Sequence, residues 1–292
     1  MESLRNTLFD LQATGYLPDM FQYGFLINGL VAALMIGPLL GGMGSLVVIK
    51  RLAFFSEAVG HAALTGIAIG ILLGEPASHP FAALFSFCLI FAILLHWVKS
   101  RTAVPYDALV GVFLAVAIAM GAALLLYVAR KVNVHILENV LFGSILTVQD
   151  SDLAILAVIA AICTLAMLLF GNRALVATLN PELAQVSGIH VRLYDYMFIV
   201  LIALITVAAV KIAGAILVGA MLLIPATTAR LVTRNVMQFF WCNILISTLC
   251  CVAGILLPMA FDLPIPSGAS IVLLASVGFV AAVVFNRIRS LV

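Results

Sequence analysis

Residues 52–74 read LAFFSEAVGHAALTGIAIGILLG, an apolar stretch that is interrupted by Glu57 and His61. A stretch of this length and hydrophobicity is typical of a helix that crosses a membrane. On a helix, a separation of four residues brings the two side chains onto one face, one turn apart. Ionisable groups inside a membrane span are costly to keep there, so they mark a functional site. A carboxylate beside an imidazole supplies two ligands of the kinds that transition metals bind.

The composition excludes a soluble domain. The chain has 292 residues, of which 65% are hydrophobic and 9% are charged, whereas soluble domains carry about 25% charged residues. We therefore predict an all-α, polytopic membrane helical bundle, with residues 1–292 forming a single transmembrane domain. Residues 1–20 lack the continuous apolar core of a signal peptide and are predicted to lie in the membrane interface. A net charge of +2 gives no indication of nucleic-acid binding.

Apolar stretches recur along the chain at the length of about 20 residues that a spanning helix requires. The sequence predicts nine spans, at about 21–49, 52–74, 80–98, 106–129, 152–171, 193–210, 212–231, 235–259 and 267–286. The first span is long enough to tilt or to break near Pro38. Two spans meet at Lys211 with almost no loop, so one of them is a candidate half-helix.

Basic residues gather in the breaks that follow the first, third, fifth, seventh and ninth spans. Loops rich in Lys and Arg stay on the cytoplasmic side of a membrane. This pattern therefore predicts that the N-terminus lies outside and the C-terminus lies in the cytoplasm.

Small residues recur every four positions in the first two spans. The rows are Gly29, Ala33, Gly37, Gly41 and Ser45 in the first span, and Ala58, Ala62, Gly66, Gly70 and Gly74 in the second. Such rows let helix backbones approach closely. In the second span the row runs beside Glu57, His61 and Thr65, so one helix carries both a packing face and a polar face. Thr65 is thereby predicted to line a transport pathway.

The longest break on the basic side, around residues 180–190, has the signals of a short helix. Asn180 is a good N-cap, Pro181 suits the first helical position, and Gly188 suits the C-terminal stop. We predict a helix at about 181–187, on the cytoplasmic side. This helix is either a capped linker or an element that docks a cytoplasmic partner.

Glu57 and His61 either bond to each other or hold a metal ion. A helix that starts near Arg51 would carry Glu57 about 9 Å and His61 about 15 Å into the membrane, close to the depth of many transport sites. Tetrahedral zinc takes four ligands, and the sequence offers no second intramembrane pair at ligand spacing. A twofold dimer that joins the pairs of two chains would complete the site.

Five stretches together resemble the bacterial ABC importer permeases for zinc, manganese and iron. They are RLAFFSEAVGHAALTGIAIG (51–70), DALVGVFLAVAIAMG (107–121), NVLFGSIL (139–146), GAILVGAMLLIPATTARL (214–231) and DLPIPSGASIVLLAS (262–276). They come in the order of the family and cover nearly the whole chain. The set is specific, although each stretch alone would be weak.

The resemblance implies a homodimeric permease in the bacterial inner membrane. Its partners would be a second copy of itself, two cytoplasmic ATP-binding subunits and an extracytoplasmic metal-binding protein. Glu57 and His61 take the places of the family's metal ligands, which are usually Asp and His. The coupling helix that docks on the ATPase maps onto the segment with Pro181, Glu182, Ala184, Gln185 and Gly188.

The chain departs from the family pattern at two positions. Glu57 stands where the family usually has Asp, and Gly60 stands where Ser or Ala often precedes His. Glu is one methylene longer than Asp, so carboxylate chemistry is kept while the size of the site changes. The choice among zinc, manganese and iron is therefore left open, with zinc slightly favoured because it binds such ligands more tightly than manganese does.

Three functions would use the same residues. The leading one is the permease of an ATP-driven importer of a divalent metal. The chain lacks the GxxxxGK[ST] phosphate loop and other catalytic motifs, so it is not expected to be an enzyme, and ATP hydrolysis would belong to a separate chain. The transported metal ion is the ligand, and no prosthetic group is expected. The alternatives are a secondary transporter, in which Glu57 carries protons, and an intramembrane metalloenzyme.

Overall fold

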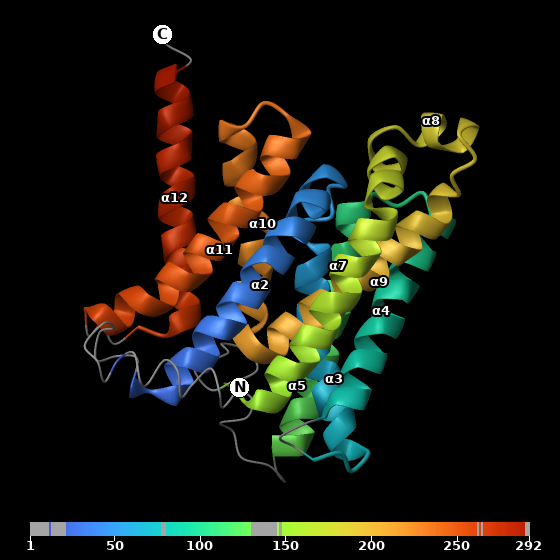
Figure 1. Cartoon of the computed structure of the whole chain (residues 1–292). Coiled ribbons are helices and arrows are strands. Elements are labelled where there is room, and N and C mark those ends of the chain that lie inside the picture. Colours follow the sequence, from blue (N-terminus) through green and yellow to red (C-terminus); the bar gives the residue numbers. More distant parts are fainter. Residues whose placement is uncertain are drawn as a thin grey trace.

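The architecture is a bundle of long helices, and every regular element in the described part of the chain is helical (Figure 1). This computed structural model describes residues 12, 22–76, 80–129, 145, 148–261, 263 and 265–289. The helices are α2 (Gly24–Ile49), α3 (Phe55–Leu72), α4 (Phe81–Arg101), α5 (Tyr106–Ala129), α7 (Asp150–Leu179), α8 (Pro181–Val186), α9 (Val191–Ala213), α10 (Ala215–Val232), α11 (Val236–Ala260) and α12 (Ser267–Arg289). The predicted interfacial segment at 1–20 lies, apart from Gln12, outside the described residues.

Among the described residues, 9 helices are long and apolar enough to cross a membrane. This confirms the number and the order of the predicted spans. α2 is a continuous helix through Pro38. The expected boundary at Lys211 is wrong, because α9 continues to Ala213 and the turn is made by Gly214 at φ 87°. Neither neighbour of this turn is a half-helix, since α10 still has 18 residues.

Successive helices alternate in direction, so the turns between them fall at opposite ends of the bundle (Figure 1). α8 and the C-terminal end of α12 lie at the same end. Basic residues in the helix ends and turns at this end are exposed; they are Arg51, Arg101, Arg173, Arg192, Arg230 and Arg234. By the positive-inside rule, we predict that this end faces the cytoplasm.

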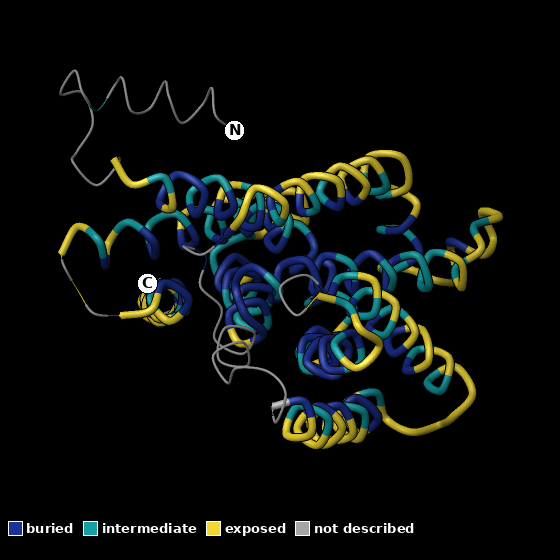
Figure 2. Tube along the Cα trace, turned by 90° about the horizontal axis from the view of Figure 1, so that it is seen from below, coloured by how far each residue is buried: buried dark blue, intermediate teal, exposed yellow. Residues whose placement is uncertain are grey.

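α3 and α9 form the centre of the bundle. In each of them, 72% of the most apolar window is buried, against 22% in α5, α7 and α12. Figure 2 shows the same arrangement, with buried residues concentrated along the inner helices and exposed ones along the outer helices. The side chain pair in α3 is therefore carried by an inner helix rather than by one surrounded by lipid.

Gly37 and Gly66, one from each small-residue row, lie at close helix contacts, as predicted, whereas Gly74 at the end of the second row is exposed and has no atom within 4 Å of the place of a Cβ. A methyl group built on Gly37 of α2 would stand 2.7 Å from the Cα of Thr248 in α11. One built on Gly66 of α3 would stand 3.0 Å from the Cα of Leu84 in α4. Both contacts are with backbone atoms, which cannot move aside as a flexible side chain can. Glycine is thus required for α2 to pack on α11 and for α3 to pack on α4.

α9 is also fixed at the end of the bundle opposite α8. There Lys211 Nζ lies 3.4 Å from Asp152 Oδ1 at the start of α7, and 4.0 Å from the centre of the Phe81 ring at the start of α4. Both side chains of the ion pair are largely sheltered. This contact ties α9 to two neighbouring helices.

Candidate metal site

A tight turn after α2 sets the start of α3. Arg51 has φ 57°, and the backbone amides of Leu52 and Phe55 donate to the carbonyl oxygens of Val47 and Leu52, at 2.9 and 3.1 Å. The chain reverses here, and α3 begins at Phe55. Glu57 therefore lies in the first helical turn, where the positive end of the helix dipole stabilises a carboxylate.

Glu57 and His61 share one face of α3, as their spacing predicted. Both side chains are partly exposed, whereas their neighbours Ala58, Val59 and Ala62 are fully buried. The helix thus packs with one side in the bundle and presents the carboxylate and the imidazole on the other side.

Within the described residues, neither Glu57 nor His61 has a hydrogen-bond or ion-pair partner. The bond between them that the sequence left open is not formed. A carboxylate at membrane depth needs water, a cation or a donor to balance its charge. Across the described part of the chain, no group of three or more His, Cys, Asp and Glu side chains could hold a metal ion. One chain therefore brings two ligands to this face.

Thr65 does not share the partly exposed face of Glu57 and His61, and its role as a pathway-lining residue stays a prediction. Its side chain is 0% exposed, and its Oγ1 donates to the carbonyl oxygen of Ala117 in α5 at 3.1 Å. The reason lies in the helix period. Each step of four residues turns the row by about 40° because a helix has 3.6 residues per turn. Two steps after Glu57, the row has rotated into the contact with α5.

The segment around residues 180–190 forms the capped helix that the sequence predicted. Asn180 Oδ1 accepts a hydrogen bond from the backbone amide of Leu183 at 3.0 Å, and Pro181 is the first helical residue. At the other end, Gly188 has φ 74°. The amides of Gly188 and Ile189 donate to the carbonyl oxygens of Gln185 and Ala184, at 3.0 and 2.9 Å. This is the Schellman arrangement, which closes a helix end and fixes the direction of the chain that follows.

Within this segment, Ala184 differs from the other predicted coupling residues. Pro181, Glu182, Gln185 and Gly188 are exposed, but Ala184 is 0% exposed. α8 packs on α7 and α9, and Ala184 is its buried residue. Ala184 therefore holds α8 on the bundle and offers no surface to a partner.

Sequence reasoning missed the two apolar residues that α8 exposes. Leu183 is 57% exposed and Val186 is 91% exposed. A short capped helix that leaves such side chains uncovered has the composition of a docking surface. The helical period could have found them: at about 100° per residue, Leu183 and Val186 point about 100° and 160° away from Ala184, so the three side chains cannot all face the bundle.

Over residues 22–286, the chain matches the ABC 3 transport family. The chain belongs to this family. The match extends from the residue pair before α2 into α12, and it confirms the resemblance that the five sequence stretches indicated.

Proteins with similar sequences include membrane proteins of metal transport systems. The manganese transport system membrane protein MntC of Halalkalibacterium halodurans is 32% identical over 273 residues, which cover 94% of this chain and 91% of MntC. The high-affinity zinc uptake system membrane protein ZnuB of Haemophilus influenzae is 31% identical, with 92% and 100% covered.

A solved structure has the same fold. PsaBC from Streptococcus pneumoniae, in complex with a Fab, superposes with a TM-score of 0.78 at 27% identity, and the match covers 97% of this chain and 95% of that chain. The predicted all-α bundle of an ABC permease is thus confirmed.

Proposed function

We propose that this chain is the membrane permease subunit of an ATP-driven importer for manganese or zinc. The observation that carries the proposal is the pair Glu57–His61, which lies without a partner, among the described residues, on the partly exposed face of an inner helix. Family membership supports the transport role. The names of the relatives support manganese and zinc as the cargo, with ferrous iron as a third candidate from the sequence resemblance.

A dimer of this chain would bring four ligands together. Each copy offers one carboxylate and one imidazole, and a twofold axis that passes near the exposed face of α3 would place the two pairs opposite each other. Two imidazoles and two carboxylates suit tetrahedral zinc. Bidentate carboxylates with added water suit manganese, which prefers more oxygen ligands. The longer side chain of Glu57 gives the carboxylate the reach for either arrangement.

Transport would proceed by alternating access. The ion enters from an extracytoplasmic binding protein, is held by Glu57 and His61 of both copies, and leaves to the cytoplasm when the ATPase subunits close and reopen. Only a neutral imidazole binds a metal, so protons compete with the ion and loading should weaken at low pH. The site must also release the ion, so the four side chains that bind it must be able to exchange for water or other ligands.

α8 is the proposed contact with the ATPase. It lies at the basic end of the bundle, where Leu183 and Val186 form a small apolar surface beside the exposed Glu182 and Gln185. A buried apolar anchor within a polar rim is the usual composition of a stable protein contact. The caps at Asn180 and Gly188 keep this surface in one conformation.

The proposal is tested by metal uptake into proteoliposomes that contain the permease with its ATPase and binding protein. Glu57→Gln keeps the size of the side chain and removes its charge, and His61→Ala removes the imidazole. We expect each variant to lose uptake about a hundredfold, because removing even a residue that only orients a metal ligand costs about 10–100-fold in affinity, and these variants change a ligand itself. Glu57→Asp is the matched control: it keeps the carboxylate and should retain uptake, with a changed preference between manganese and zinc.

Wild-type uptake by Glu57→Gln or His61→Ala would contradict the site. Uptake that continues without ATP and follows a proton gradient would instead support the secondary transporter in which Glu57 carries protons. Native gel or mass measurement of the variants should still report the dimer, since neither side chain is part of the packing contacts of α3.

A further inference from the structure

α9 is the helix that follows directly after α8, and the link between them is rigid. Four residues separate the two helices, and the hydrogen bond from the amide of Ile189, the third of them, to the carbonyl oxygen of Ala184 folds this link back onto α8. Ala184 is buried where α8 packs against α7 and α9. A displacement of α8 is therefore passed to the start of α9 rather than absorbed by a flexible loop.

The segment that leads into α3 is joined to α9 by an ion pair. Lys50, the residue that ends α2, places its Nζ 2.5 Å from Asp195 Oδ1 in the first turns of α9. The two side chains are 14% and 32% exposed, so the pair is partly shielded from solvent. The same ammonium lies 5.1 Å from the centre of the buried Phe198 ring. Lys50 stands immediately before the turn that starts α3, seven residues ahead of Glu57.

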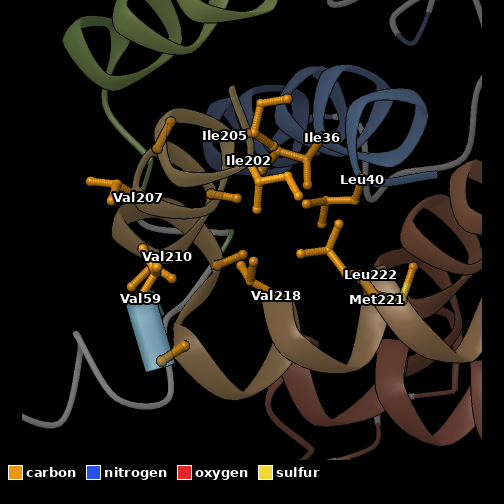
Figure 3. Close-up of a cluster of buried hydrophobic side chains, with 14 of the residues drawn as sticks. Ile36, Leu40, Val59, Ile202, Ile205, Val207, Val210, Val218, Met221 and Leu222 are labelled. Atoms are coloured by element: carbon orange, nitrogen blue, oxygen red, sulfur yellow. The ribbon is translucent and has the colours of Figure 1, made fainter. Parts of the chain in front are cut away.

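A second contact joins α9 to the metal-binding turn itself. Gly60 lies between Glu57 and His61, and a methyl group built on it would stand 3.6 Å from Val210 Cγ2 and 3.6 Å from Ala215 Cβ. Val210 lies in the last turn of α9 and Ala215 begins α10, on either side of the Gly214 turn. In Figure 3, Val59 and Val210 are drawn next to each other at this contact. The turn that carries both ligands thus rests on the α9–α10 junction.

Between these two contacts, α9 is an uninterrupted helix. Its sequence from Val191 to Ala213 contains neither Gly nor Pro. The fifteen residue steps from Asp195 to Val210 span about 22 Å at 1.5 Å per step. A tilt at one end of a packed helix reappears at the other end, because packed cores move between discrete arrangements rather than deform.

We propose that α9 transmits movement of α8 to the Glu57–His61 turn, with Lys50–Asp195 and Gly60 as its two joints. This rests on the proposed function. A shift of α9 would move the start of α3 through Lys50 and the ligand turn through Gly60, which changes the separation of the two ligand pairs across the dimer. Lys50, Asp195 and Gly60 are positioning residues in this scheme, since none of them binds the metal.

The first joint is tested by charge exchange in the complete complex. Lys50→Ala and Asp195→Ala should each keep ATPase attachment and metal binding, while the amount of metal taken up per ATP hydrolysed falls about fivefold or more, the lower range of coupling between sites. The double variant Lys50→Asp with Asp195→Lys should restore this ratio. Lys99→Ala is the matched control, because Lys99 lies at the same end of the bundle and donates within its own loop, to the carbonyl oxygen of Val104.

The second joint is tested by size. Gly60→Ala fits the ordinary contact distances and should transport normally, whereas Gly60→Val should lower uptake per ATP and should be partly rescued by Val210→Ala. A normal ratio of metal uptake to ATP hydrolysis in Lys50→Ala, Asp195→Ala and Gly60→Val would overturn the proposal. It would also be overturned if the single variants lost uptake per ATP and neither the charge exchange nor Val210→Ala restored it. Glu57→Gln, run in parallel, separates the cases: if it abolishes uptake while the joint variants are normal, only the transmission role of α9 fails.

Discussion

α3 and α12 are both long enough to span a membrane, yet the less apolar of the two lies in the centre of the bundle. The most apolar window of α3 has a mean hydropathy of 1.4 and is 72% buried, whereas that of α12 has 2.4 and is 22% buried. A soluble protein would show the opposite order. In a membrane, lipid solvates apolar side chains as well as a protein interior does, so hydrophobicity does not draw helices inward. Small residues and polar groups draw helices inward instead.

The glycines of α3 and α12 also differ in whether they contact a neighbouring helix. Gly66 of α3 faces the backbone of Leu84, whereas Gly278 of α12 has no atom within 4 Å of the position where a Cβ would stand. One glycine is a packing requirement and the other lies on an open surface. The difference cannot be read from the residue type.

The largest effect is expected from a bulky residue at Gly66, and Gly278 supplies the matched control. Gly66→Leu would force a side chain against backbone 3.0 Å away, and overpacking of this kind costs about 1–3 kcal/mol or more. We expect loss of the folded dimer, measured by size-exclusion chromatography and thermal unfolding in detergent. Gly278→Leu should assemble as the wild type does. Equal behaviour of the two variants would show that the contact between α3 and α4 is not close in the membrane.

An intermediate effect is expected in α8, where Ala184 is buried and the other residues of the helix are exposed. Ala184→Arg should destabilise the permease itself, because a guanidinium has no room where α8 packs on α7 and α9. Val186→Arg should leave the permease dimer stable and weaken ATPase attachment about tenfold or more, as the loss of an interface anchor does. Copurification of the ATPase, compared with dimer stability, distinguishes the two. A stable Ala184→Arg permease that fails to bind the ATPase would show that Ala184 belongs to the docking surface after all.

The smallest effect is expected at Thr65. Thr65→Val keeps the shape of the side chain and removes the hydrogen bond to Ala117. Side-chain bonds between membrane helices contribute about 0.6 kcal/mol on average, so the unfolding temperature should fall slightly while metal uptake stays normal. Loss of metal uptake at unchanged stability would instead support a role for Thr65 in the transport pathway.

The sequence predicted local features well and lateral contacts poorly. The caps of α8 at Asn180 and Gly188 were predicted from residue type, because a cap is made within a few residues of the chain. The boundary between α9 and α10 was placed at Lys211, since a charge normally marks a membrane edge. The structure shelters that charge in a pair with Asp152, so the helix continues to Gly214.

In the candidate site, too, the local features were predicted and the contacts between distant residues were not. Glu57 and His61 were found from their chemistry and their spacing, and their shared face follows from the period of a helix. Thr65 was assigned to that face by extending a four-residue row that does not close on a period of 3.6. The ion pair of Lys50 with Asp195 joins residues that are 145 positions apart, and no local pattern relates them.

The amino-acid sequence by itself determined the membrane-spanning bundle, the number of spans, the capped helix after Asn180 and the two candidate ligands. Each of these depends on composition or on residues within a few turns of one another. Only the tertiary structure decided which face of each helix meets a neighbour: that Thr65 is buried on α5, that Ala184 is turned inward, and that α9 contacts both Lys50 at the end of α2 and Gly60 in α3. The physical reason is that faces toward lipid and faces toward protein are equally apolar in a membrane, so hydrophobicity leaves no sign of which is which.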